Sequence, residues 1–286
     1  KMQIIDGKEI SNRVKERVKA EAIALKDMGI TPTLAVILVG EDKASQTYVA
    51  SKEKSTIACE MGSVAHKLPE STTQDELLAL IELLNADDSI DGILVQLPLP
   101  KHIDERAVLE LIDPKKDVDG LTSAQMGYLA TNHDETLIPC TAHGVLQMLL
   151  SLCPDLSGKD VTIVNSSNLI GKPLRELLNQ RKCTVTLCHS RTKDLKSKMR
   201  NADIVITGIG KPYYFDYTYF TDSQIIIDCG LSYYEAAGKL VGDVWLPQVE
   251  DRLNVLIASG TGHTGLATTT MLMYNTLQAC KRNHKE

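Results

Sequence analysis

The amino-acid sequence predicts an α/β protein of two domains. Short apolar runs alternate with stretches of helical length and period, which is the pattern of parallel strands joined by crossover helices. This alternation occurs twice along the 286 residues, a length that suits two domains of ordinary size. A turn-rich stretch at residues 153–158 separates the two series. We therefore expect one α/β domain over residues 1–150 and another over residues 151–267. A last helix, within residues 268–286, is expected to pack back onto the first domain.

The first series contains three runs that predict strands. Residues 34–39 and 92–97 are short, largely apolar and bounded by glycine or proline, as expected of strands covered on both faces. Thr73 and Glu76 have the spacing of a capping box, which predicts that a helix begins there. In chain order, the expected elements are helix 10–28, strand 34–39, helix 44–61, strand 64–68, helix 73–85, strand 92–97 and helix 104–112.

The second series is more compact. A polar loop joins its first strand to a helix that begins near Gly171 and ends near Gln180. This order of elements predicts a Rossmann-like dinucleotide-binding domain. The last helix is expected to start near Thr268 and to extend to about Cys280. The strands of this series are expected at residues 161–164, 184–188, 202–207 and 224–228.

Composition argues against several classes of protein. The net charge of −6 disfavours nucleic acid or an anionic membrane as the main partner. No apolar run approaches the roughly 20 residues that cross a bilayer, and the first residues lack the apolar core of a signal peptide. The seven cysteines are scattered, without CxxC or Cys/His ligand spacing, so we expect reduced thiols and no metal. A cytoplasmic protein is therefore expected.

Polar side chains gather where the first domain is expected to bind a ligand. Tyr48 and Lys52 are four residues apart on one predicted helix, so both project from one face, with Ser45 beside them. Gln96 ends a buried strand, at the carboxyl edge where open α/β sheets bind ligands. Asp119 precedes a glycine in a later loop. A lysine, a tyrosine, a glutamine and a carboxylate together are suited to binding and activating a polar heterocycle.

Each of these residues also has an ordinary structural interpretation. Tyr48 and Lys52 have the spacing of a solvated helix face, which is the commoner outcome on periodicity alone. Asp119 before glycine is typical of a turn. Gln96 is the stronger candidate, because a polar residue that closes an apolar run and is followed by Pro98 indicates a shaped loop.

Four short strings give the chain a resemblance to a known family. In sequence order they are YVASK (48–52), VQLPLP (95–100), KDVDG (116–120) and PCT (139–141). They resemble motifs of the bifunctional methylenetetrahydrofolate dehydrogenase/methenyltetrahydrofolate cyclohydrolase family, at the spacing of that family and over nearly the whole chain. The resemblance implies an enzyme, usually a homodimer, that interconverts 5,10-methylene-, 5,10-methenyl- and 10-formyltetrahydrofolate.

The resemblance also implies roles for residues of a folate-binding first domain. Lys52 resembles the catalytic lysine, and Gln96 resembles the glutamine that hydrogen-bonds this lysine and tunes its charge. Tyr48 resembles the tyrosine that packs against the folate. Asp119 resembles the carboxylate that grips the pterin, whose ring N–H and exocyclic amine offer two parallel donors. The catalytic group would then be Lys52, Gln96 and Tyr48, and the substrate site Tyr48, Ser45, Gln96, Leu97, Pro98 and Asp119.

The second domain carries a modified phosphate-binding loop. Between a predicted strand and helix, NSSNLIGKP (165–173) resembles the family's GxSxxVGxP, with Asn165 in place of the first glycine. Asparagine tolerates unusual backbone angles, although its side chain narrows the approach for a pyrophosphate. Cofactor contacts are expected at Asn165, Ser166, Ser167, Ile170, Gly171, Pro173, Ser190, Arg191, Gly208, Gly230 and Gly262.

The cofactor is expected to be NADP rather than NAD. Enzymes that use NAD commonly place Asp or Glu after the second strand to hold the ribose 2′-hydroxyl. This chain has Ser190 and Arg191 there, and a hydroxyl and a guanidinium suit a 2′-phosphate. The competing structural interpretation is that Arg191 is a surface charge.

Residues 259–268 depart most from the family pattern. The family has PVPGGVGPMT at this place, whereas this chain has SGTGHTGLAT, without any of the three prolines. Smaller departures lie at residues 121–123 and at Ala142.

The expected activity is NADP-dependent oxidation of 5,10-methylenetetrahydrofolate, followed by hydrolysis of the methenyl product with Lys52 as proton relay. A cyclohydrolase with weakened or lost dehydrogenase activity is a competing hypothesis, because both cofactor loops are altered. A second competing hypothesis is a non-catalytic folate or nucleotide-binding protein. A third is an unrelated NADP-dependent reductase.

Overall fold

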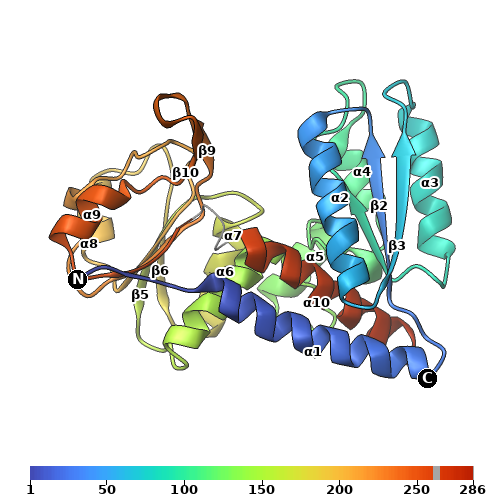
Figure 1. Ribbon diagram of the computed structural model, residues 1–286, viewed down its shortest axis with the longest axis horizontal. Coiled ribbons are helices and arrows are strands. Elements are labelled where there is room, and N and C mark those ends of the chain that lie inside the picture. Colours follow the sequence, from blue (N-terminus) through green and yellow to red (C-terminus); the bar gives the residue numbers. More distant parts are fainter. Residues whose placement is uncertain (260–264, 286) are drawn as a thin grey trace. The chain divides into compact units, whose positions relative to one another are not determined.

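The computed structural model describes residues 1–259 and 265–285, and it describes side chains outside 260–267. The chain divides into two compact units (Figure 1). The N-terminal unit consists of Asn12–Cys140 and Thr269–Glu286, and the C-terminal unit of Lys1–Ser11 and Thr141–Thr268. Each unit is built on a parallel sheet with helices packed against it, so the predicted two-domain α/β fold is confirmed.

The N-terminal unit has a three-stranded sheet in the order β3-β2-β4. Its strands are β2 (Thr33–Val39), β3 (Gly62–Leu68) and β4 (Gly92–Val95). Its helices are α1 (Gly7–Asp27), which begins in the other unit, α2 (Lys43–Ala58), α3 (Gln74–Ala86), α4 (Glu105–Leu111), α5 (Ser123–Ala130) and α10 (Gly265–Asn283).

The central strand β2 is buried on both faces. Its even-numbered residues from Leu34 to Leu38 pack with residues of α1, α2 and α10. Its odd-numbered residues from Ala35 to Val39 pack with residues of α3 and α4. Because both faces meet a helical layer, every position from Leu34 to Val39 is apolar and buried, and this explains the continuous hydrophobic run.

The last helix belongs to the N-terminal unit, as predicted. In Figure 1 α10 runs alongside α1, and Lys281 Nζ donates to Glu21 Oε1 at 3.0 Å between them. Met273 and Leu277 of α10 are completely buried in the same core as the even-numbered residues of β2. Residues from the two ends of the chain therefore complete one hydrophobic core.

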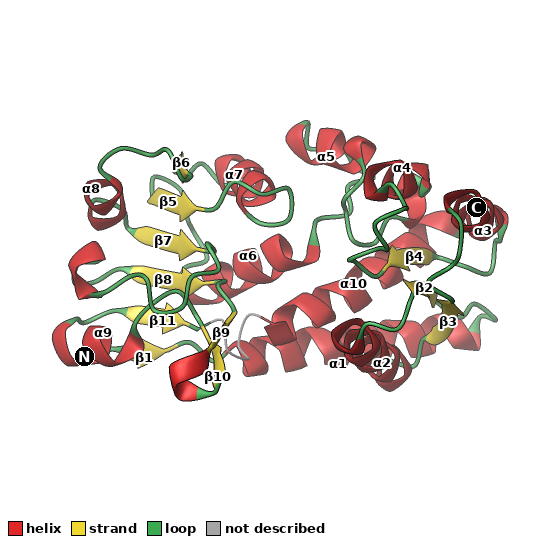
Figure 2. Ribbon diagram, turned by 90° about the horizontal axis from the view of Figure 1, so that it is seen from above, coloured by secondary structure: helices red, strands yellow, loops and turns green. Residues whose placement is uncertain are grey.

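The C-terminal unit has a six-stranded parallel sheet in the order β1-β11-β8-β7-β5-β6 (Figure 2). The strands are β1 (Gln3–Ile4), β5 (Asp160–Val164), β6 (Thr184–Cys188), β7 (Ile204–Thr207), β8 (Ile225–Asp228) and β11 (Leu256–Ala258). The helices are α6 (Cys140–Leu152), α7 (Gly171–Gln180), α8 (Leu195–Arg200) and α9 (Leu246–Arg252). A separate antiparallel pair consists of β9 (Ser232–Tyr234) and β10 (Lys239–Val241).

The division between the units differs from the sequence-based boundary near residue 151. The structure divides the chain at Thr141 and assigns Lys1–Ser11 to the C-terminal unit. The first residues belong there because β1 extends the large sheet: the Gln3 N–H donates to Val255 O and the Ile5 N–H to Ile257 O, both at 2.8 Å. A strand of two residues has too little periodicity to be recognised in a sequence. None of the described helices is both long and apolar enough to cross a membrane.

Candidate active site

Lys52 and Gln96 are in direct contact at the carboxyl end of β4. Lys52 lies in α2, and its Nζ donates to Gln96 Oε1 at 2.7 Å. Gln96 directly follows β4, and its backbone N–H donates to Ile37 O of β2 at 2.9 Å, so the sheet fixes its position. The Gln96 side-chain Nε2 donates to Leu97 O at 3.3 Å, which is consistent with an amide oxygen directed at the lysine.

The surroundings of Lys52 favour its neutral form. Burial lowers the pKa of Lys52, and the negative charge of nearby Asp119 opposes this shift without reversing it. Gln96, its hydrogen-bond acceptor, is only 8% exposed and carries no charge. A lysine with a lowered pKa exchanges protons more readily near neutral pH than an exposed one does.

Asp119 is the carboxylate of this cluster. Burial raises the pKa of Asp119 to about 6, while the positive charge of Lys52 lowers it and the negative charge of Asp117 raises it. The two acids and the lysine are therefore electrostatically coupled. A ligand that brings N–H donors would stabilise the ionised form of this carboxylate, because the donors replace the water molecules that burial removes.

Asp117, which sequence reasoning did not single out, holds the loop that carries Asp119. Its buried carboxylate accepts from the Gly120 N–H at 3.0 Å and from the Thr122 N–H at 2.7 Å. Gly120 has a φ of +72°, and a Cβ there would lie 2.7 Å from Leu137 O. The glycine after Asp119 is therefore required by the backbone path. The motif predicts the loop, but only the fold shows which of its two aspartates is structural.

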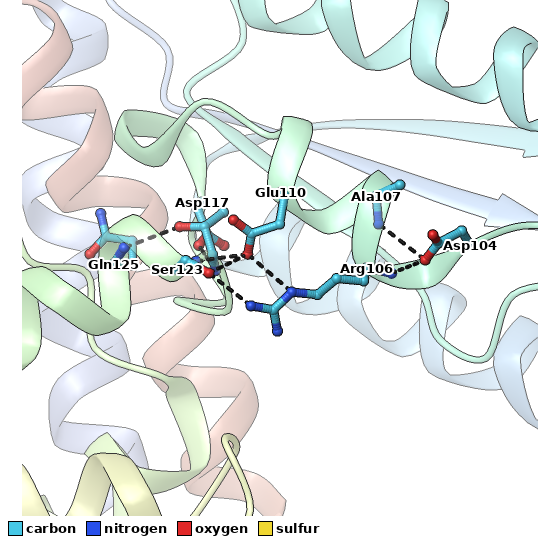
Figure 3. Close-up of polar contacts among 8 residues, drawn as sticks. Asp104, Arg106, Ala107, Glu110, Asp117, Ser123 and Gln125 are labelled. Carbon is cyan, nitrogen blue, oxygen red and sulfur yellow. Dashed lines mark hydrogen bonds and ion pairs between the residues drawn. The ribbon is translucent and has the colours of Figure 1, made fainter.

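A second set of contacts ties this loop to α4 (Figure 3). The Ser123 N–H donates to Glu110 Oε1 at 2.8 Å, and Arg106 donates to Ser123 Oγ at 2.8 Å. Asp104 caps the same helix by accepting from the Arg106 N–H at 3.0 Å. These exposed contacts connect the helix after β4 to the segment that follows Asp119.

The remaining predicted substrate residues have different environments. Tyr48 is 53% exposed on α2, so its ring is available to a ligand. Ser45 is buried, and its hydroxyl donates to Asp42 Oδ2 at 2.9 Å, where it helps to cap α2. Leu97 and Pro98 are joined by a cis peptide bond. Ser45 therefore has a structural role at the start of α2. The exposed ring of Tyr48 is free to contact a ligand.

In the C-terminal unit, the Asn165 side chain organises the turn from β5 to α7. Its Oδ1 accepts from the Ser167 N–H, the Ser167 hydroxyl and the Gly171 N–H at 2.8–2.9 Å. Its Nδ2 donates to Gly208 O at 2.7 Å. A Cβ at Gly171 would lie 1.8 Å from Asn165 O, so this glycine is required. Asn165 does not adopt a positive φ, so hydrogen bonding, and not a tolerance of unusual backbone angles, maintains the turn.

A cavity of about 830 Å³ lies beside this turn. Of the predicted cofactor residues, it is lined by Asn165, Ser166, Ser167, Ser190 and Gly208. It is also lined by two lysines that sequence reasoning missed, Lys196 and Lys211, which lie over the rings of Tyr219 and Tyr214. Hydroxyls, amides and lysines are the groups expected around phosphates.

Those of the other predicted cofactor residues that the structure describes are not among the residues that line the cavity. Ile170 precedes α7, and Gly171 and Pro173 are buried in its first turn. Arg191 is exposed, and its backbone N–H donates to His189 Nδ1 at 3.1 Å. A Cβ at Gly230 would lie 2.1 Å from Asp243 Oδ1, so this glycine accommodates a neighbouring carboxylate. Gly262 lies outside the described residues.

Two buried acids, also missed, shape the wall of the cavity. Asp243 accepts from the Ile209 N–H at 2.7 Å and from the Lys211 N–H at 3.1 Å. Asp228 accepts from the Asp243 N–H at 3.2 Å and from the Val244 N–H at 3.0 Å. Burial raises the pKa of Asp228 to about 6. No local sequence pattern marks these residues, because their partners lie in separate loops.

Comparison with known proteins identifies the family. Residues 5–119 match the catalytic-domain model of tetrahydrofolate dehydrogenase/cyclohydrolase, and residues 139–284 match the NAD(P)-binding-domain model of the same enzymes. The chain belongs to the tetrahydrofolate dehydrogenase/cyclohydrolase family. Strands β2 to β4 of the N-terminal unit lie within the catalytic-domain match, and strands β5 to β11 of the C-terminal unit lie within the NAD(P)-binding-domain match.

Relatives of this dehydrogenase/cyclohydrolase family cover the whole chain. A bifunctional protein FolD from Campylobacter fetus is 51% identical over 284 residues, which is 99% of each protein. The bifunctional FolD structure from Campylobacter jejuni has a TM-score of 0.94 at 41% identity and covers 99% of both chains. A Trypanosoma brucei FolD structure, complexed with NADP cofactor and inhibitor, has a TM-score of 0.90 at 32% identity over 100% of this chain and 99% of that one.

Proposed function

We propose that this chain oxidises 5,10-methylenetetrahydrofolate to 5,10-methenyltetrahydrofolate with NADP+ and hydrolyses the product to 10-formyltetrahydrofolate. Membership of the dehydrogenase/cyclohydrolase family supports both steps. The observation that carries the proposal for this chain is the 2.7 Å hydrogen bond from Lys52 to Gln96. A binding protein would need neither this pair nor a lysine whose pKa is lowered by burial.

In the hydrolytic step, Lys52 acts as a proton relay. The methenyl substrate is a cation, so its arrival lowers the pKa of Lys52 further and favours the neutral amine. One N–H of this amine is directed at Gln96 Oε1, which restricts the orientation of its lone pair. The neutral amine then takes a proton from the water that attacks the methenyl carbon. It returns this proton to the ring nitrogen N5 as the C–N5 bond breaks, and the proton of the new hydroxyl is released to solvent, which leaves the formyl group on N10.

Asp119 holds the pterin. Its carboxylate accepts two parallel N–H donors, one from the pterin ring and one from the exocyclic amine. Asp117 and Gly120 keep the loop in the required conformation. Tyr48 packs against the folate. It lies on the helix that carries Lys52, and about half of its surface is exposed. Binding and orientation then supply most of the rate enhancement for the oxidation, which needs no protein nucleophile.

The cavity of the C-terminal unit would hold NADP+. Asn165, Ser166 and Ser167 bind its phosphates at the turn into α7, and Ser190 with Lys196 favours a 2′-phosphate. When bound, NADP+ would supply the hydride acceptor for oxidation of the methylene carbon. The size, hydroxyls and positive charges of the cavity fit such a ligand.

A cyclohydrolase without dehydrogenase activity is the second candidate, because residues 259–268 differ from the family pattern. Two absorbance assays on the purified protein distinguish the candidates. Formation of the methenyl compound from methylenetetrahydrofolate and NADP+ reports the dehydrogenase. Accelerated decay of supplied methenyltetrahydrofolate reports the cyclohydrolase. Accelerated decay of the methenyl compound without its formation from methylenetetrahydrofolate would favour the second candidate. If both activities are absent, the protein is a binding protein.

We also propose that the protein is a cytoplasmic homodimer. Tyr233 and Leu240 of the small β9–β10 sheet, and Leu231 just before it, are 49–61% exposed. They form a suitable apolar surface for a second copy. All seven cysteines are free, as expected in a reducing compartment. Light scattering after gel filtration should give about twice the 31.4 kDa chain mass. Leu240→Asp should then shift the protein toward the monomer, whereas a monomeric wild type would contradict the proposal.

A further inference from the structure

Three metal-ligating side chains meet on the N-terminal unit, away from Lys52. Asp91 directly precedes β4, and Cys280 and His284 lie on the last turns of α10 and just beyond it. One donor atom from each residue lies within 4.8 Å of the other two. Cys280 and His284 are four residues apart, so the helix presents both on one face.

We infer that Asp91, Cys280 and His284 form a Zn²⁺ site with three protein ligands and a fourth position for water. Thiolate, imidazole and carboxylate are the ligands that Zn²⁺ prefers. With metal–ligand bonds of about 2.0 Å to nitrogen and oxygen, tetrahedral geometry places those two atoms about 3.3 Å apart. His284 Nε2 and Asp91 Oδ1 are 3.1 Å apart, so a small adjustment would admit the ion.

The backbone orients the carboxylate in advance. The Thr33 N–H, at the start of β2, donates to Asp91 Oδ2 at 2.9 Å. The Asp91 N–H donates back to Thr33 O at 3.0 Å. One carboxylate oxygen is thus held by the sheet, and the other is directed toward His284. Outer contacts of this kind orient metal ligands in known sites.

The charges of the site suit a divalent cation. Cys280 and Asp91 are 0% and 1% exposed. Bound Zn²⁺ would compensate one thiolate and one carboxylate, so the buried charges would sum to zero.

The site is accessible from one side. The His284 side chain is 31% exposed and lines a cavity of about 550 Å³. Arg282 and Lys116 line the same cavity, but both donate to backbone carbonyls. The other charged groups of its wall, of mixed sign, are Lys115, Lys285, Asp88, Asp113 and Glu135. The ion would connect the end of α10 to the start of β4.

Cobalt substitution of the reduced, chelator-treated full-length protein tests the inference. Co²⁺ should produce a thiolate charge-transfer band in the near ultraviolet and visible bands typical of four-coordinate cobalt. Cys280→Ser should abolish the charge-transfer band, and the matched control Cys59→Ser, also a buried thiol of this unit, should retain it. His284→Gln should weaken Co²⁺ and Zn²⁺ binding by about tenfold or more, and the exposed control His133→Gln should not.

Thermal unfolding gives an independent measurement. Zn²⁺ at about a hundredfold excess over its dissociation constant should raise the Tm of the wild type by roughly 5 °C or more, and should not raise that of His284→Gln. His284 is largely at the surface, so this variant should fold even if Cys280→Ser does not. Absence of a thiolate band in the wild type, its persistence in Cys280→Ser, or equal affinity of His284→Gln and wild type would overturn the inference. The histidine would then be a simple hydrogen-bonding partner of Asp91.

Discussion

At the scale of single residues, Lys52 is the side chain on which the hydrolytic step depends. Lys52→Met should lower methenyl hydrolysis by about 10²–10⁴-fold, the usual contribution of a positioned proton relay. Binding of a folate analogue should stay within about tenfold, because the amine acts mainly on the reacting centre. Stopped-flow decay of methenyltetrahydrofolate measures the first effect and fluorescence titration the second. Lys54→Met, on the exposed side of the same helix, is the control. Normal hydrolysis by Lys52→Met would refute the assignment.

Asp119 should make folate binding depend on pH. The carboxylate must be ionised to accept the pterin donors, and its pKa is raised to about 6. Affinity for a folate analogue should therefore be constant above that pH and fall as the pH drops below it. Asp119→Ala should weaken binding by about 2–4 kcal/mol and remove this dependence, with little change in cofactor binding. A mutant that keeps the wild-type profile would place the pterin elsewhere.

Cofactor choice is the third residue-scale prediction. The wild type should bind NADP+ about ten- to a hundredfold more tightly than NAD+, the contribution of a charge-assisted bond. Since Lys196 lines the cavity and Arg191 does not, Lys196→Ala should reduce this preference at least as much as Arg191→Ala. Lys193→Ala is the exposed control. Titration of both cofactors measures the effects, and equal wild-type affinities would identify both cations as ordinary surface charges.

At the scale of elements, the turn between β5 and α7 depends on one amide. Asn165→Ala removes three accepted hydrogen bonds and one donated bond. We expect a loss of about 2 kcal/mol in the free energy of unfolding and weaker NADP+ binding. Urea unfolding and cofactor titration check both. Asn168→Ala, in the exposed part of the same loop, should change neither. Unchanged stability of Asn165→Ala would mean that the backbone holds the turn alone.

The last helix offers a second prediction at this scale. Leu277 is completely buried in the core shared by α1, α2, β2 and α10. Leu277→Ala should cost about 2–5 kcal/mol in unfolding free energy, because it leaves a cavity that the surrounding helices cannot fill. Leu83→Ala, at a position 70% exposed, should stay within about 0.5 kcal/mol of the wild type. Similar midpoints for the two variants would show that α10 is not part of this core.

At the scale of the whole molecule, chain order and spatial order differ. Lys1–Ser11 complete the sheet of the C-terminal unit, and Thr269–Glu286 complete the core of the N-terminal unit. The sequence predicts that the C-terminal helix packs on the N-terminal unit, because a helix of that length needs an apolar surface to cover. It does not predict that the first residues join the C-terminal sheet, because β1 has only two residues and its hydrogen bonds go to β11, more than 250 residues away.

The sequence by itself determined the α/β class, most strands and helices of both units, and the strings that indicate the family. These features are local: periodicity, capping residues and short motifs depend on neighbours a few residues apart. The pairing of Lys52 with Gln96 came from the family resemblance, and the structure supplies the distance between them.

Only the tertiary structure decided which residues act on each other across the chain. It distinguished Asp117, which holds a loop, from Asp119, whose negative charge acts on Lys52. It brought Lys196 to the cavity that Arg191 does not line, and it placed Asp91 against His284. The physical reason is that hydrogen bonding, burial and charge act over a few ångströms in space. Partners separated by tens or hundreds of residues therefore leave no mark on the local pattern.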